Sequence, residues 1–190
     1  MVSGVRFSDG SPTNSLAGIL ARLFVIYGGK EGTFMTIRKA NAEDVKGIMS
    51  LLYQVAEVHH KGRPDIFKGG CSKYTEEELT EIIKAPNTPV YVAEDENGAI
   101  CGHAFCVFKE GGDNHVLVNN KTLYIDDICV DENCRGKHVG TALCNTVIAM
   151  AKESGCYNVT LNVWCLNEGA MEFYKAMGFV PQRITMEKFV

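Results

Sequence analysis

The chain has 190 residues, 46% of them hydrophobic, and a formal net charge of −4 at pH 7. This length and apolar content allow one hydrophobic core and predict a single main domain. The mildly acidic charge argues against nucleic acid as a partner, and the apolar runs are too short to span a membrane.

The first 34 residues are interpreted as an N-terminal extension, and the domain proper as residues 35–190. Lys30-Glu31-Gly32 can be encoded as AAG-GAG-GGN, a bacterial ribosome-binding sequence at a natural distance before a start codon for Met35. Residues 1–34 are therefore expected to come from a misassigned start or to be dispensable. The alternative is a genuine accessory helix over residues 15–27.

Periodicity and turn signals predict a strand, two helices and a β-hairpin in the first part of the domain. The predicted elements are a strand at 36–40, helices at 42–61 and 74–85, and strands at 90–94 and 100–109. Asn41 is a candidate cap for the first helix, and Thr75 with Glu78 forms the capping-box pattern of the second. Asn97-Gly98 is a strong signal for the hairpin turn.

The second part of the domain predicts alternating strands and helices. The predicted elements are a strand at 122–130, a helix at 138–154, a strand at 157–163, a helix at 167–177 and a final strand or hairpin at 179–189. Asn167 is expected to cap the last helix and Gly178 to end it. The order β-α-α-β-β-β-α-β-α-β indicates an α/β (α+β) domain.

The cysteines are interpreted as reduced, buried thiols of a cytoplasmic protein. Most of them lie inside apolar runs, and neither a secretory signal nor a C-x-x-C pair is evident. They are Cys71, Cys101, Cys106, Cys129, Cys134, Cys144, Cys156 and Cys165.

A glycine-containing turn, Arg135-Gly136-Lys137-His138-Val139-Gly140, joins the predicted strand 122–130 to the helix that follows. A strand that leads through such a turn into a helix aims several unpaired backbone N–H groups at one point, and the helix dipole adds to them. The turn therefore suits an anion such as a pyrophosphate. By itself it is weak evidence, and the alternative is a tight strand-to-helix connection without a ligand.

A second block follows downstream. It comprises Asn162-Val163-Trp164-Cys165-Leu166-Asn167, then Ala170, Phe173, Tyr174, Gly178 and Phe179. Together the two blocks resemble the GCN5-related N-acetyltransferase (GNAT) family, and the resemblance extends from Thr36 to Val190. It implies the GNAT fold, with a mixed central sheet of about six to seven strands, a splayed pair of parallel strands and helices on both faces. It also implies acetyl-CoA as the co-substrate.

The resemblance implies which residues bind the cofactor. The backbone of Ile128, Cys129 and Val130 would pair with the pantetheine arm like an added strand. The remaining implied contacts are Arg135, Gly136, Lys137, His138, Val139, Gly140, Thr141, Asn162, Asn167, Ala170, Phe173 and Tyr174. His138 replaces a glycine of the family pattern, and it is expected to adopt a helical first turn without a positive φ.

Amine acetylation requires that a proton leave the amine. With a pKa of about 10.4, roughly one alkylamine in 2,500 is neutral at pH 7. Tyr174 is expected to donate a hydrogen bond to the departing thiolate. Cys129 is rejected as a nucleophile because its neighbours are apolar and no activating base is evident.

Asp126 and Asp127 are the candidates for handling the amine. Consecutive strand residues point to opposite faces, so only one carboxylate is expected to reach a given cleft. The strand resembles that of polyamine acetyltransferases, which carry Glu-Asp at these positions. That resemblance implies Asp126 as the base or amine-binding group, and Asp127 as a structural residue bonded to a nearby loop. The alternative is that both are structural and that water removes the proton.

The segment between the first two helices is expected to form one wall of the acceptor cleft. Its candidate lining residues are His59, His60, Asp65 and Phe67, and a solvated helix end is the alternative. Trp164 either lies on the floor of the cleft or packs in the core. No metal site is expected, because adjacent histidines diverge on a helix and no third ligand is indicated.

The sequence therefore predicts an acyltransferase that moves an acetyl group from acetyl-CoA to a primary amine of a small molecule, a polyamine or an amino compound. The alternatives are a peptide or protein N-terminal acetyltransferase and a non-catalytic acetyl-CoA-sensing module. The sequence does not reveal the oligomeric state; dimers are common in the family, which makes a homodimer a candidate.

Deletion of residues 1–34 is expected to leave folding and activity intact, because the predicted elements of the domain lie downstream. Circular dichroism and the acetyl-transfer rate of the shortened chain test this expectation. An insoluble or inactive product would contradict it.

Overall fold

The structure is a computed structural model that describes residues 24–28, 33–111 and 115–190. Its centre is a six-stranded sheet in the order β1-β2-β3-β4-β5-β6, which confirms the predicted mixed sheet. The strands are β1 (Phe24–Gly28), β2 (Thr33–Lys39), β3 (Val90–Asp95), β4 (Ile100–Lys109), β5 (Thr122–Val130) and β6 (Asn158–Leu161). The helices are α1 (Val45–Gly62), α2 (Glu76–Lys84), α3 (Val139–Glu153) and α4 (Glu168–Ala176).

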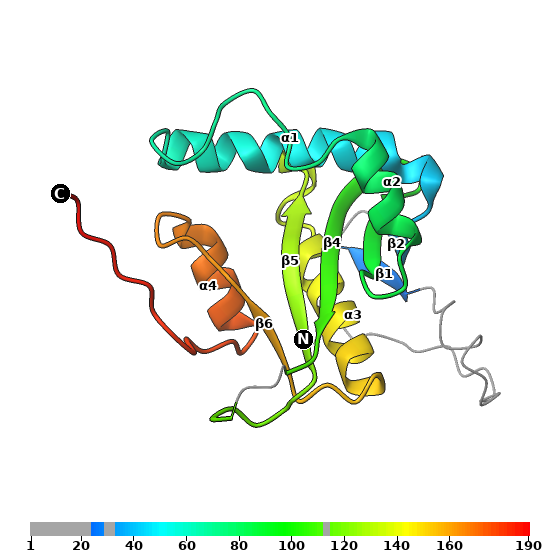
Figure 1. The fold of residues 1–190 in the computed structure, drawn as a ribbon. Helices are drawn as coiled ribbons and strands as arrows, with labels where there is room; N and C mark the ends of the chain where they lie inside the picture. Colours follow the sequence, from blue (N-terminus) through cyan, green and yellow to red (C-terminus); the bar gives the residue numbers. More distant parts are fainter. Residues whose placement is uncertain (1–23, 29–32, 112–114) are drawn as a thin grey trace.

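The last two strands of the sheet separate. Strands β1 to β5 are antiparallel to their neighbours, whereas β6 pairs with β5 in parallel. The β5–β6 pairing ends at Ile125 and Leu161, while β5 continues to Val130 along β4. Figure 1 shows the two strands diverging toward α1. The predicted splayed pair of parallel strands is therefore present.

Helices cover both faces of the sheet, because the strands carry apolar side chains on each face (Figure 1). On one face α3 packs against β4 and β5, with Leu143 and Leu123 fully buried. On the other face α1 and α2 form a second core, in which Ile48, Leu79 and Val92 are fully buried. None of the helices in the described ranges is both long and apolar enough to cross a membrane.

Local side-chain bonds start the helices where the sequence predicts. Asn41 caps the short 3₁₀ helix (Ala42–Asp44) that leads into α1. Thr75 and Glu78 form the predicted reciprocal capping box of α2. Asn167 Oδ1 accepts a hydrogen bond from the backbone N–H of Ala170 in the first turn of α4. Together, these caps fix the ends of the loops that carry the site.

Part of the predicted N-terminal extension lies in the sheet. Residues 24–28 form β1, which pairs with β2 along its whole length. An accessory helix over 15–27 is therefore wrong for residues 24–27, and residues 1–23 lie outside the described residues. β2 itself begins at Thr33, before the boundary expected at Met35. Because β1 is an edge strand, its removal leaves the pairing of β2 with β3 in place.

The prediction of a final strand at 179–189 is wrong. Gly178 ends α4 with a φ of +86°, and the chain beyond it has no regular element. This tail runs away from β6 in Figure 1 and is held toward α1 by an ion pair between Glu187 Oε1 and Arg63 Nη1 at 2.6 Å. A strand requires a partner edge, and this course of the tail provides none.

All eight cysteines are free thiols, and the prediction that they are buried is wrong for two of them. Four of them, Cys101, Cys106, Cys129 and Cys144, are buried, whereas Cys71 and Cys165 are exposed. Burial raises the pKa of Cys106 and Cys129 to about 12, which keeps both as protonated, apolar core groups.

Candidate functional site

The opening between β5 and β6 has a local cause. After Leu161 the chain leaves the sheet and reaches the C-terminal end of α1, where Trp164 meets Phe67 edge-on with ring centroids 5.0 Å apart. Leu166 also lies close to Gly62 at the end of α1. These contacts hold the β6–α4 loop away from β5. The edge of β5 from Asp126 to Val130 therefore has no strand partner on the β6 side within the described residues.

A β-bulge lies at the point where the sheet opens. β4 and β5 are in register up to Ile125 opposite Cys106, and then from Asp127 opposite Phe105, so Asp126 is the extra residue on β5. A bulge interrupts the two-residue alternation of side chains. The expectation that Asp126 and Asp127 point to opposite faces fails for this reason.

Both carboxylates contact one aromatic cluster. Tyr74 Oη donates to Asp126 at 2.9 Å, and His103 Nε2 lies 3.4 Å from Asp127 Oδ2. The rings of Tyr74 and His103 both pack on Phe105, at centroid distances of 5.9 and 4.9 Å. The bulge thus brings two carboxylates to the same side of the sheet, beneath α1 and α2.

Asp126 is partly exposed and already has two donors. Lys73 Nζ lies 2.6 Å from its Oδ2, the same oxygen that accepts from Tyr74. Burial lowers the pKa of Lys73, but the hydrogen bond and charge of Asp126 outweigh it and raise that pKa overall. Burial and the same carboxylate raise the pKa of Tyr74, so its phenol remains a donor.

Asp127 is the less exposed of the two carboxylates, with a side chain that is 13% exposed. Burial would raise its pKa, but His103 outweighs that effect, with smaller contributions from Lys73 and His59, and holds the pKa below its ordinary value. The partner of Asp127 is thus a residue of β4 and not of a loop, which corrects the expectation. His103 is fully buried, and its Nδ1 has no hydrogen-bond partner among the described residues.

The predicted anion-binding turn lies at the start of α3. Arg135, Gly136, Lys137 and His138 are exposed, and α3 begins at Val139 without a side-chain cap. The N–H groups of an uncapped first turn remain available to a ligand, and the positive end of the helix dipole lies beside them.

The expectation about the backbone of His138 is wrong. It adopts a left-handed conformation with φ 61° and ψ 15° at the N-cap, and Gly136 also has a positive φ of 75°. The glycine of the family pattern suits that conformation, and histidine adopts it at a cost in strain. The left-handed backbone at position 138 thus explains why the family pattern has a glycine there.

Helix α4 brings the second sequence block to the first. Phe173 lies beside Gly140, where an added Cβ would meet its ring at 3.5 Å. Asn167 caps the helix, and Asn162 donates to Tyr124 Oη of β5 at 3.1 Å. The two blocks therefore meet in space.

Tyr174 points inward from α4 and is 8% exposed. Its ring packs against Phe173 and Phe179, with centroid distances of 5.2 and 5.6 Å. Burial, with smaller effects of Cys144 and Asp127, raises the pKa of Tyr174 well above its usual range. The phenol therefore remains protonated, which suits a hydrogen-bond donor.

The predicted acceptor wall is only partly assembled by the structure. The ring of His59 lies 4.9 Å from that of Phe67, which in turn contacts Trp164, so Trp164 belongs to this wall and not to the core. Burial lowers the pKa of His59. His60 Nδ1 instead lies 2.7 Å from the Phe67 carbonyl, and Asp65 forms an ion pair within its own loop.

The family is established by comparison with known proteins. Residues 52–179 match the family described as Acetyltransferase (GNAT) family. The chain belongs to the GNAT acetyltransferases. Thialysine N-epsilon-acetyltransferase of Bos taurus is 26% identical over 155 residues, which cover 76% of this chain and 84% of that enzyme.

Solved structures share the fold of the chain. A mutant form of the BH1408 protein of Bacillus halodurans matches with a TM-score of 0.78 and 28% identity, over 81% of this chain and 98% of that one. Glucosamine-6-phosphate N-acetyltransferase of Arabidopsis thaliana matches with a TM-score of 0.61 and 25% identity, over 82% of this chain and 97% of that one. The chain is accordingly an acetyl-CoA-dependent N-acetyltransferase of the GNAT family.

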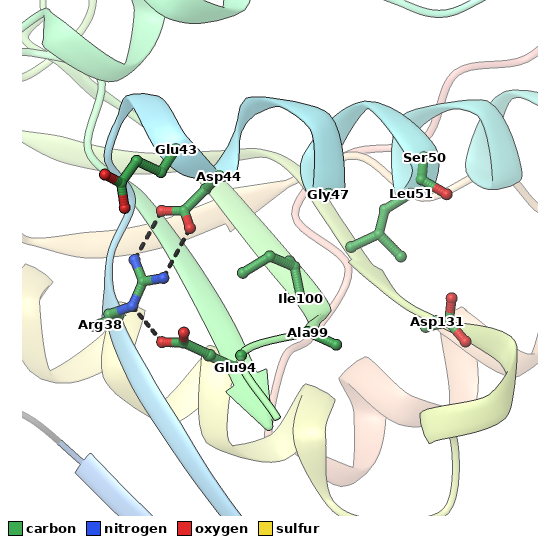
Figure 2. Close-up of a pocket in the computed structure, with 11 residues that line it drawn as sticks. Arg38, Glu43, Asp44, Gly47, Ser50, Leu51, Glu94, Ala99, Ile100 and Asp131 are labelled. Carbon is green, nitrogen blue, oxygen red and sulfur yellow. Dashed lines mark hydrogen bonds and ion pairs between the residues drawn. The ribbon is translucent and has the colours of Figure 1, made fainter. Parts of the chain in front are cut away.

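A pocket of about 450 Å³ lies elsewhere in this GNAT domain, between the N-terminal half of α1 and the β3–β4 turn. Figure 2 shows Arg38 bound to Asp44 and Glu94 on its floor, with Asp131 at the far side. None of the predicted site residues lines it. Because Arg38 is saturated by its carboxylate partners, the pocket is attributed to packing beneath α1.

The structure adds three residues that the sequence reasoning missed. Lys73, Tyr74 and His103 are the partners of the two carboxylates, and each is far from them in the sequence. A histidine within the apolar strand 100–109 was the one usable signal, because a buried imidazole needs a polar partner. Nothing local marks Lys73 or Tyr74.

Replacement of Tyr174 by Phe is expected to lower kcat by about 10²-fold, the usual effect of losing one donor to developing negative charge. Folding should be unaffected, because the phenol makes no hydrogen bond within the described residues. Steady-state kinetics and thermal unfolding test this, with Tyr91→Phe as a partly buried control whose hydroxyl donates to Met150 Sδ. An unchanged kcat would contradict a role for Tyr174.

Proposed function

We propose that this enzyme transfers the acetyl group directly to a primary amine of a small molecule, a polyamine or an amino compound. Asp126 would hold the acceptor amine, and Tyr174 would face the leaving thiolate. The observation that carries the proposal is the open edge of β5, which starts at Asp126 and faces α4.

The open edge supports a position for the cofactor. The backbone of Ile128, Cys129 and Val130 is paired with β4 on one side only, so an extended amide chain such as pantetheine can add to the other side. The uncapped start of α3 lies just beyond Val130 and would receive the pyrophosphate. The thioester would then lie near the bulge at Asp126.

The reaction balances without a covalent enzyme intermediate. The amine nitrogen forms a bond with the acetyl carbon, the carbon–sulfur bond breaks, and the thiolate takes a proton. Deprotonation of the ammonium costs on the order of 4.6 kcal/mol at pH 7, which makes it the larger problem. Asp126 would act as the general base, accepting the proton of the ammonium directly or through water.

The relatives support a small acceptor. Their names specify thialysine and glucosamine 6-phosphate, both small amines. His59, Phe67 and Trp164 pack into one wall beside the β6–α4 loop, and a wall of this kind would also suit a small molecule. A small-molecule amine is therefore favoured over a protein acceptor.

We further propose a homodimer. The outer edge of β6 has no strand partner among the described residues, and the tail exposes the apolar side chains of Val180, Ile184 and Met186. Reciprocal pairing of each tail with the partner's β6 would cover both. Sedimentation velocity should give a dimer that Met186→Asp weakens, and a monomeric wild type would contradict the proposal.

Asp126→Asn is expected to lower kcat/KM by about 10²-fold or more, because the amide cannot neutralise an ammonium. The loss should be greatest at low pH, where nearly all of the acceptor is protonated. The dissociation constant of acetyl-CoA should barely change, since the cofactor contacts lie on other residues.

Thiol release from acetyl-CoA across a panel of primary amines measures the effect, and calorimetry measures cofactor binding. Glu81→Gln on the surface of α2 is the matched control, because that carboxylate contacts only Lys84. Wild-type rates in the Asp126→Asn variant would contradict the role proposed for Asp126 at the acceptor amine.

A further inference from the structure

The two oxygens of Asp126 are not equivalent. Lys73 Nζ and Tyr74 Oη both converge on Oδ2, at 2.6 and 2.9 Å. Oδ1 accepts no hydrogen bond from any residue that the structure describes. One face of this carboxylate is therefore occupied by the protein, and the other remains available to a ligand.

The two donors are held differently. The ring of Tyr74 packs on Phe105 and belongs to the core beneath α2, so its phenol is fixed. The Lys73 side chain is 43% exposed, and Asp126 is its one ion-pair partner within the described residues. An ammonium group has three N–H donors. Lys73 therefore presents a positive charge with unused donors beside the free oxygen of Asp126.

The other charged groups of this region already have ion-pair partners. Asp127 is bound by His103, and the guanidinium of Arg63 is bound by Asp65 and Glu187. The site thus offers a ligand one carboxylate oxygen and one ammonium, side by side. A second cationic group of a ligand would meet Lys73 and be repelled, whereas an acidic group would be attracted.

We infer that the acceptor carries an acidic group as well as its primary amine, with the amine on Asp126 Oδ1 and the acid on Lys73. This inference rests on the proposed function and narrows it, because it favours amino acids and amino-sugar phosphates over polyamines. Lys73 would be the residue that makes this choice. Charge-assisted hydrogen bonds of this kind are among the stronger polar contacts in proteins.

Matched acceptor pairs test the inference. Lysine and cadaverine differ by one carboxylate, and glucosamine 6-phosphate and glucosamine differ by one phosphate. Wild-type enzyme should have the higher kcat/KM for the acidic member of whichever pair it acetylates. In Lys73→Met this preference should fall by about tenfold, through a higher KM for the acidic acceptor and a lower KM for its neutral or cationic counterpart.

Two variants control the experiment. Lys73→Arg keeps a cation and should retain the preference even if Lys73→Met is poorly folded. Lys61→Met removes an exposed lysine at the C-terminal end of α1, where its ion-pair partner is Glu57, and should change nothing. Thermal unfolding reports whether each variant is folded.

The possible outcomes separate this inference from the proposed function. A wild-type preference for cadaverine or glucosamine overturns the inference and leaves acetyl transfer to small amines intact. An unchanged preference in a folded Lys73→Met variant also overturns it. Failure to acetylate any of the four amines or any member of the wider panel contradicts both.

Discussion

The parallel pairing of β5 with β6 stops at Ile125 and Leu161, and the rest of the site depends on that interruption. Backbone N–H and C=O groups inside a sheet are normally paired, so an open edge in the middle of a domain is costly unless something else fills it. Here the edge belongs to the strand that carries Asp126, and it faces the helix that carries Tyr174. A polar, extended cofactor arm is the kind of ligand that such an edge accommodates.

The same region of β5 also places two carboxylates on one side of the sheet. A regular strand would send Asp126 and Asp127 to opposite faces of the sheet. The bulge removes this alternation and directs both toward the cluster around Phe105. His103 stabilises the negative charge of Asp127. Asp126 is bound by the protein at Oδ2, and its other oxygen is left for the acceptor. The two acids therefore differ in role because they differ in exposure: Asp127 is the more buried and binds His103, and Asp126 is the more exposed and can meet the acceptor.

The sequence allowed prediction of whatever is decided locally. The caps at Asn41, Thr75 and Asn167 and the hairpin at Asn97-Gly98 depend on neighbours within a few residues, and each is present. The family resemblance supplied the splayed strands and the meeting of the two sequence blocks. Both could therefore be predicted before any coordinates were known.

Other features depend on residues far apart in the chain and could not be predicted. The bulge is a mismatch of β5 with β4, which no pattern within β5 records. Lys73 meets Asp126 across 53 positions of the chain, a contact that only the folded structure creates. The left-handed conformation of His138 was not predicted because histidine rarely adopts it. The prediction of a final strand was wrong because the tail has no strand edge beside it.

Hydrogen exchange with and without acetyl-CoA tests the central claim most directly. If the cofactor arm adds to β5, the amides of residues 128–130 that are not bonded to β4 should gain protection, together with those of residues 136–141 at the start of α3. Amides of β2 and β3, on the far side of the sheet, should not change. Saturating cofactor that leaves residues 128–130 and 136–141 as exposed as before would contradict the account.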